Sequence, residues 1–131
     1  ETEGVMTRID SDLLALLDAC AQGKLDEVDY KTSKNTSVTV MLVSGGYPED
    51  YKKGVVMSGL DDLSDDCIIA HAGTKLNENG DVVTSGGRVI AVTAHGKDIE
   101  EARNKAYQNV EKIRFEGVNY RHDIGLDLMK F

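Results

Sequence analysis

The stretch TSGGRVIAVTA, residues 84–94, limits the fold more than any other part of this chain. Its second half is an apolar, β-branched run, which is the pattern of a buried strand. Its first half contains Gly86 and Gly87, and glycine is costly to order and gives no side chain to a core. The chain therefore either turns sharply here or is closely approached by another group. Arg88 stands at the junction, and its side chain points either to a partner or to one of the chain's own carboxylates.

A long helix is predicted directly after this strand. Asp98 and Glu101 have the spacing of a capping box, which satisfies free backbone N–H groups at a helix start. Up to about Arg114, apolar residues then recur at helical spacing: Ile99, Ala102, Ala106, Val110 and Ile113. We expect this apolar face to pack on the sheet.

The segments before the glycine pair predict further strands. SVTVMLV (37–43) is apolar on both alternating faces, which is typical of a strand covered on both sides. CIIAHAGT (67–74) predicts another strand, and VVMSGL (55–60) predicts a short strand or an extended piece. The Asn-Gly pair at 79–80, with apolar residues on either side, is a strong signal for a hairpin. The segment SGGYPEDYKKG (44–54) holds the only proline and predicts a loop.

The N-terminal part predicts a helix followed by a connector. Ser11 or Asp12 can cap the helix, and Gly23 suits the left-handed position that ends it. Its broad apolar face consists of Leu13, Leu14, Leu16, Leu17 and Ala21. The polar connector spans 24–37, where Val28 and Tyr30 could form a short edge strand. The sequence therefore predicts an α+β fold, in which a small, mostly antiparallel sheet is packed by one long helix and preceded by an N-terminal helix.

Charge and composition exclude several classes of protein. A formal net charge of −8 argues against a sequence-independent nucleic-acid binder or an anionic-membrane binder, because both need a basic face. A local basic pocket that includes Arg88 remains compatible with this charge. No apolar run approaches the roughly 20 residues of a membrane span. Cys20 and Cys67 stand in apolar settings and predict buried free thiols, from which we infer a cytoplasmic protein.

No self-sufficient catalytic constellation is found in the sequence. The three histidines lack the spacing of a helical metal pair, and the acidic residues of 61–66 indicate a solvated turn. Three glycine-bearing turns, SGGYP, HAGTK and SGGR, adjoin predicted strand ends. A turn alone explains any one of them. If the sheet brings all three to one edge, their backbone N–H groups and Arg88 can meet an anionic ligand.

These motifs, in their order, resemble a known enzyme family. SGGYPEDYKKG, SGL, HAGTK, VVTSGGRVIAVTAHGKD and FEGVNYRHDIG are similar to the C-terminal region of the phosphoribosylamine–glycine ligase family, within the ATP-grasp superfamily. Each motif alone is weak, but five in this order and spacing are specific. The start of the chain, without an initiator methionine, resembles the end of the family's ATP-grasp domain. The resemblance implies that residues 1–36 are the tail of that domain and residues 37–131 the C-terminal ligase domain.

The resemblance also implies a function. Members of the family use ATP, with Mg or Mn, to join glycine to 5-phosphoribosylamine, giving glycinamide ribonucleotide, ADP and phosphate in de novo purine biosynthesis. The metal ligands and most of the ATP site lie upstream of Glu1 in that family. We therefore expect no catalytic or metal residue in this chain, no cofactor bound to it alone, and no activity of the isolated chain. Its expected partners are the upstream domains and small-molecule substrates, not nucleic acid or a membrane.

The resemblance points to one group of site residues. In a related formate-dependent transformylase, basic residues at a position similar to SGGR hold the phosphate of the ribonucleotide. Arg88 is thus the predicted ligand for the phosphate of phosphoribosylamine, with Gly86 and Gly87 allowing backbone approach. The weaker candidates are Thr74, Lys75, Tyr47 and Arg121. The alternative is a non-catalytic α+β module that binds a ligand or partner without chemistry.

Overall fold

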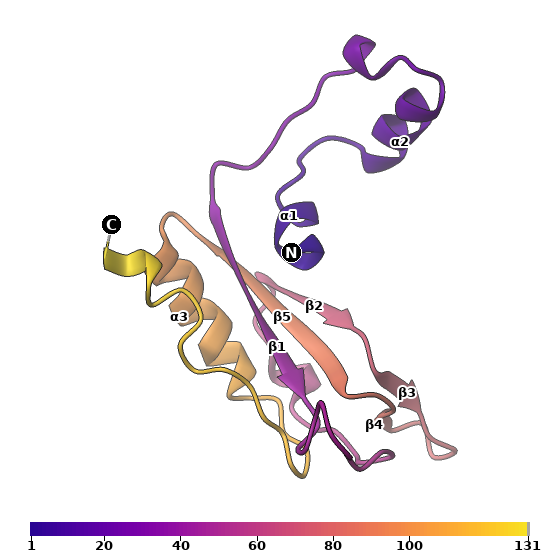
Figure 1. The fold of residues 1–131 in the computed structure, drawn as a ribbon, viewed down its shortest axis with the longest axis vertical. Coiled ribbons are helices and arrows are strands. Elements are labelled where there is room, and N and C mark those ends of the chain that lie inside the picture. Colours follow the sequence, from indigo (N-terminus) through magenta and orange to yellow (C-terminus); the bar gives the residue numbers. More distant parts are fainter. Residues whose placement is uncertain (131) are drawn as a thin grey trace.

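A computed structural model describes residues 1–130 of the chain (Figure 1). The strands are β1 (Thr36–Val43), β2 (Cys67–His71), β3 (Thr74–Leu76), β4 (Val82–Thr84) and β5 (Arg88–Gly96). The α-helices are α1 (Thr2–Met6), α2 (Leu13–Ala21) and α3 (Ile99–Val110), and short 3₁₀ turns lie at Leu25–Glu27, Leu60–Asp62 and Leu128–Lys130. The strands form an antiparallel sheet in the order β1-β5-β2 and a separate antiparallel pair, β3-β4. The predicted α+β class is confirmed.

The core lies between the three-stranded sheet and α3. β5 is the central strand, and its residues 89–94 are all buried. Val38, Val40 and Leu42 of β1 pair with Ala94, Val92 and Ile90 of β5, and these six side chains belong to the core under α3. The other face of β1 is only half-buried, so the prediction of a strand covered on both sides holds for one face alone.

Local signals place α3 as predicted. Asp98 caps the helix through its Oδ1, which accepts from the Glu101 N–H at 2.9 Å. The return bond of Glu101 goes to the N–H of Lys97 rather than to that of Asp98. The buried apolar residues of the helix are Ala102, Ala106 and Val110, followed by Ile113 just beyond the helix end, and Asn109 is buried beside them. Ile99, predicted for the same face, is half-buried. The helix ends at Val110, a turn earlier than the predicted limit near Arg114.

The prediction for residues 67–74 needs a correction, whereas the hairpin after them is confirmed. β2 ends at His71, and Thr74 already belongs to β3, because the chain bends at Ala72 and Gly73. β3 and β4 form the predicted hairpin, with Gly80 at a φ of +86° in the turn. Residues 55–58 are extended, with isolated bridges at Val56 and Ser58, but Gly59 is left-handed with a φ of +83° and Leu60 begins a 3₁₀ turn. The predicted extended piece is therefore shorter than 55–60.

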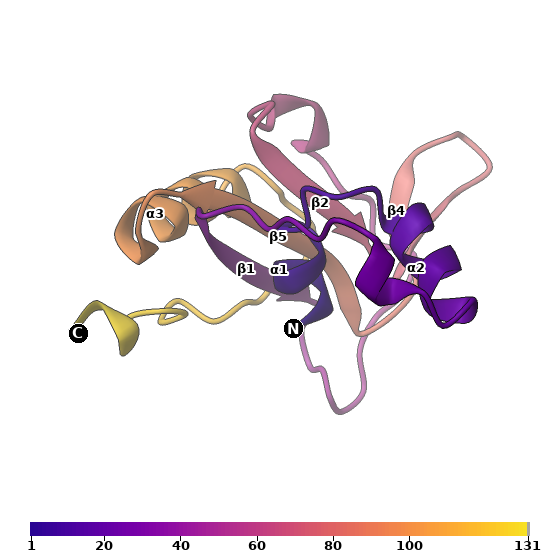
Figure 2. The same cartoon turned by 90° about the horizontal axis from the view of Figure 1, so that it is seen from above.

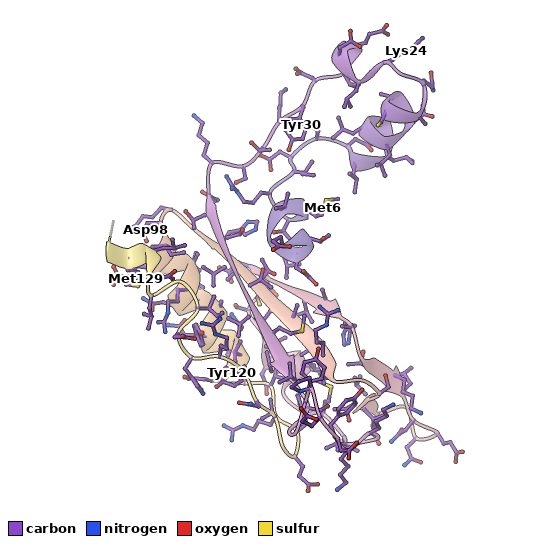
Figure 3. The ribbon with its side chains drawn as sticks, in the orientation of Figure 1. Met6, Lys24, Tyr30, Asp98, Tyr120 and Met129 are labelled. Carbon is purple, nitrogen blue, oxygen red and sulfur yellow. The ribbon has the colours of Figure 1, made fainter. Side chains whose placement is uncertain are left out.

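In the N-terminal segment, α1 lies against β1 and β5, whereas α2 and the chain on either side of it project away from the sheet (Figures 1 and 2). Asp12 caps α2 as predicted, and Gly23 is left-handed with a φ of +69°. The apolar face of α2 is largely uncovered within the described residues, where Leu16 alone of this helix is buried and Leu14 is 76% exposed. Figure 3 shows Lys24 and Tyr30 in this segment, well clear of the sheet.

Two smaller predictions were wrong. Both cysteines are free thiols, as predicted, but neither is fully buried: Cys20 is exposed because it lies on the uncovered helix α2, and Cys67 at the start of β2 is half-buried. Val28 and Tyr30 form no strand, since the bridge in this region joins Ile9 to Thr32.

Candidate functional site

The three glycine-bearing turns meet at one end of the β1-β5-β2 sheet, which fulfils the condition that the sequence left open. We call this meeting of residues 44–47, 72–74 and 85–88 the glycine junction. Ser44 donates its N–H to the Gly87 carbonyl (2.8 Å) and its hydroxyl to the Gly86 carbonyl (3.0 Å). The carbonyl of Gly73 accepts from the N–H groups of Ser85 (2.7 Å) and Gly86 (3.2 Å). The SGGYP and HAGTK turns therefore both hold the SGGR turn.

Close packing explains why the junction needs glycine. A Cβ on Gly73 would lie 2.7 Å from the Gly86 Cα, which is shorter than side chains tolerate. A Cβ on Gly87 would lie 2.6 Å from Cε2 of Tyr47 and closer still to Cδ2. Neither Gly86 nor Gly87 has a left-handed φ, so close approach and not a special backbone conformation selects glycine at these two positions. Their approach to a phosphate stays a prediction.

A register shift in the sheet decides where Arg88 points. Leu42 pairs with Ile90, but the next residue of β1, Val43, pairs with Arg88, so one step on β1 matches two steps on β5. Strict alternation from Ile90 would place Arg88 on the α3 face. Because an extra residue reverses the face, Arg88 joins the opposite face of the sheet, where Met41 and Thr39 lie.

On that face a groove of about 380 Å³ lies between α1 and the sheet. It is lined by Glu1, Glu3, Gly4, Ser37, Thr39, Met41 and Arg88. We call it the Arg88 groove. The hydroxyl of Ser37 donates to the Gly4 carbonyl (3.0 Å), and those of Thr39 and Thr93 bond each other (2.7 Å).

Arg88 itself is exposed and has no carboxylate within ion-pair distance in residues 1–130. Glu1 and Glu3 line the same groove, yet neither is paired with the guanidinium. The sequence left open whether Arg88 points to a partner or to one of the chain's own carboxylates. Within residues 1–130, it is not paired with a carboxylate. The fork of donors is available for an anion such as phosphate.

The weaker candidates are distributed over three places. Tyr47 lies inside the glycine junction, against Gly87. Thr74 is the last junction residue of its turn, at the start of β3, and its hydroxyl is hydrogen-bonded to the His71 ring (2.9 Å); Lys75 follows it as an exposed residue just outside the junction.

Arg121 lines a different groove near the C-terminus and forms a two-bonded ion pair with Asp123, both bonds at 2.9 Å. These hydrogen bonds raise the pKa of Arg121 and lower the pKa of Asp123. Helix α3 also holds the backbone of this segment, because the Tyr107 hydroxyl donates a hydrogen bond to the Arg121 carbonyl (2.6 Å). Tyr120 lies beside this helix (Figure 3). The structure therefore does not bring Arg121 into the Arg88 groove.

Sequence reasoning missed the part of the groove that α1 builds. Gly4, Glu3 and Glu1 are close to Ser37 and Arg88 only because the chain returns past α1 into β1. No local pattern indicates this contact, since α1 is too short to show a helical period. The residues 1–130 also contain no group of three acidic, histidine or cysteine side chains that could hold a metal ion. None of the described helices is long and apolar enough to cross a membrane.

The known proteins that this chain resembles in sequence point to one family. Residues 37–127 match the family "Phosphoribosylglycinamide synthetase, C domain". A phosphoribosylamine–glycine ligase of Neisseria meningitidis (strain Z2491) is 48% identical over 124 residues, which cover 95% of this chain and 29% of the relative. A chloroplastic ligase of the same name from Arabidopsis thaliana is 42% identical over 95% of this chain and 24% of its own length. This chain thus spans less than a third of these relatives.

One solved structure is similar to this chain in both fold and sequence. The crystal structure of the phosphoribosylamine–glycine ligase of Thermotoga maritima superposes with a TM-score of 0.70 at 36% identity, covering 84% of this chain and 26% of that one. The match of the family to 91 residues, more than half of the chain, and this superposition lead to the same assignment. The chain belongs to the family of the phosphoribosylglycinamide synthetase C domain.

Proposed function

We propose that this chain is the C-terminal part of a cytoplasmic ligase that uses ATP to join glycine to 5-phosphoribosylamine. The products are glycinamide ribonucleotide, ADP and phosphate, in de novo purine biosynthesis. Family membership and the names of the relatives support the reaction class. The single observation that carries the assignment of a site concerns Arg88: it has no ion pair within residues 1–130, and a register shift directs it into a groove beside α1.

In this proposal the chain contributes substrate binding and not the metal or nucleotide site. Arg88 binds the dianionic phosphate of phosphoribosylamine with charge-assisted hydrogen bonds, and Gly86 and Gly87 let the ligand approach the backbone. ATP and Mg are held by residues of the longer polypeptide, because the resemblance places the family's metal ligands and most of its ATP site upstream of Glu1. The isolated chain is therefore inactive in ATP hydrolysis and in ligation, and measurable turnover by the purified chain would contradict this.

We also propose that residues 1–36 belong physically to the upstream domain and residues 37–131 to the C-terminal domain. The apolar side chains of Val5, Leu14 and Leu17 are more than half exposed. Burial against the upstream domain would cover them. Leu14→Asp should then lower the melting temperature of the full-length ligase and leave that of this chain unchanged; equal shifts would refute the division.

The test of the proposed site is a substrate-resolved kinetic comparison in the full-length ligase. A hydrogen bond to a charged group contributes about 1.5–3 kcal/mol, so Arg88→Ala should raise KM for phosphoribosylamine about ten- to hundredfold. Arg88→Lys keeps the charge and should lose less, though not nothing, because lysine lacks the fork. KM for ATP and for glycine should stay within about twofold, since both bind elsewhere.

Arg114→Ala is the matched control, because Arg114 is an exposed arginine outside the groove. It should leave all three KM values unchanged. An equal rise of the three KM values for Arg88→Ala, or an unfolded Arg88→Ala protein, would assign Arg88 to the fold and remove it from the substrate site.

A further inference from the structure

The direction of Arg88 depends on the two residues before it, and these are held from three sides. The Ser44 bonds fix the carbonyls of Gly86 and Gly87. The backbone of Gly73 packs on Gly86, and the Gly73 N–H donates to the Arg88 carbonyl at 2.8 Å. The third side is the ring of Tyr47, which packs against Gly87.

Of the groups that hold Gly86 and Gly87, the Tyr47 ring is the least enclosed by the protein. Ser44 is 4% exposed, whereas Tyr47 is 40% exposed and its ring meets Tyr51 edge-on, with the centroids 6.1 Å apart. If Gly87 carried a Cβ, the three atoms nearest to it would all belong to the Tyr47 ring. Since the φ of Gly87 is not left-handed, the ring is the nearest obstacle to a side chain at this position.

The guanidinium of Arg88 has no ion pair within the described residues to hold it. The backbone of the SGGR turn and of β5, and not an ion pair, therefore sets where this side chain starts. A ligand that binds a loosely placed arginine must also order it, which weakens binding. A small displacement of a binding group can lower a rate about a hundredfold.

We propose that Tyr47 is a positioning residue for Arg88: its ring packs on Gly87 and fixes the SGGR turn so that the guanidinium enters the groove in one orientation. This inference rests on the proposed function, since it concerns the same phosphate site. It assigns to Tyr47 an effect through Gly87 and not a contact with substrate.

The test uses four variants of the full-length ligase and KM for each substrate. Gly87→Ala drives a methyl group into the ring, so KM for phosphoribosylamine should rise about tenfold. Tyr47→Ala leaves the turn unsupported and should raise that KM about threefold. In the double variant the methyl group no longer meets the ring, so KM should lie well below the product of the two single effects and move toward the value of Tyr47→Ala alone. Gly96→Ala is the control for stability, since its Cβ would meet the backbone of Glu101 at 2.9 Å, at the far end of β5; it should lower the melting temperature without a change in KM.

The outcomes separate the two proposals. Independent, multiplying losses in the double variant, or equal rises of KM for ATP and glycine, would overturn the positioning role of Tyr47. If Gly87→Ala does not fold, Tyr47→Ala decides, and an unchanged KM for phosphoribosylamine would overturn the inference. If Arg88→Ala raises that KM while Gly87→Ala and Tyr47→Ala do not, the positioning role is wrong and the phosphate site stands. If Arg88→Ala also leaves it unchanged, the phosphate site itself is wrong.

Discussion

The contrast between Val110 and Leu14 tests which apolar helix face forms the core. Both are aliphatic residues on the apolar face of a helix, but Val110 is 0% exposed and Leu14 is 76% exposed. Val110→Ala removes two buried methyl groups, and the lost transfer energy with the remaining cavity gives about 2–3 kcal/mol of destabilisation. Leu14→Ala removes more carbon atoms from a side chain already in water, so its effect should stay within about 0.5 kcal/mol.

Thermal unfolding of the chain, followed by circular dichroism, measures both effects. For a domain of this size we expect Val110→Ala to lower the melting temperature by roughly 8–12 °C and Leu14→Ala by less than about 2 °C. Val110→Asp places a charge without a partner in the same site and should cost several kcal/mol. Equal shifts for Val110→Ala and Leu14→Ala would refute the assignment of the core to the α3 face.

Two further predictions concern the ends of α3. Asn109 is 3% exposed, and its Oδ1 accepts a hydrogen bond from the Ser64 N–H (2.9 Å). Asn109→Ala leaves this N–H without its acceptor and should lower the free energy of unfolding by about 1–3 kcal/mol, measured by chemical denaturation. A change below about 0.5 kcal/mol would show that water replaces the amide. The bond from the Lys97 N–H, followed by the contacts of Lys105, lowers the pKa of Glu101. A lowered folded-state pKa gives stability that is present above the ordinary glutamate pKa of about 4.3 and is lost as the pH falls through the lowered value. Glu101→Gln should therefore flatten the acid limb of a stability–pH curve, and a curve identical to that of the parent chain would count against the bond.

Local signals made α3 and the β3-β4 hairpin predictable. The spacing of Asp98 and Glu101 and the recurrence of Ala102, Ala106 and Val110 are contained within one helix. The Asn-Gly turn likewise joins two strands that are adjacent in sequence. In both cases the residues that determine the element are the ones that form it.

The orientation of Arg88 was not predictable from its own neighbourhood. The pairing of Val43 with Arg88, one residue out of register, depends on a strand far away in the sequence. The glycine pair was rightly singled out, but its partners, Tyr47 and Gly73, lie in two other turns. Likewise, the apolar pattern of α2 predicts a face to be covered and carries no information on what covers it.

The most direct test of the phosphate site is a crystal structure of the full-length ligase with ribose 5-phosphate, which carries the phosphate of the proposed substrate. We expect a phosphate oxygen about 2.7–2.9 Å from a guanidinium nitrogen of Arg88, with the ligand in the groove beside α1. A phosphate bound by other residues, with Arg88 unliganded or paired with a carboxylate of the upstream domain, would contradict it.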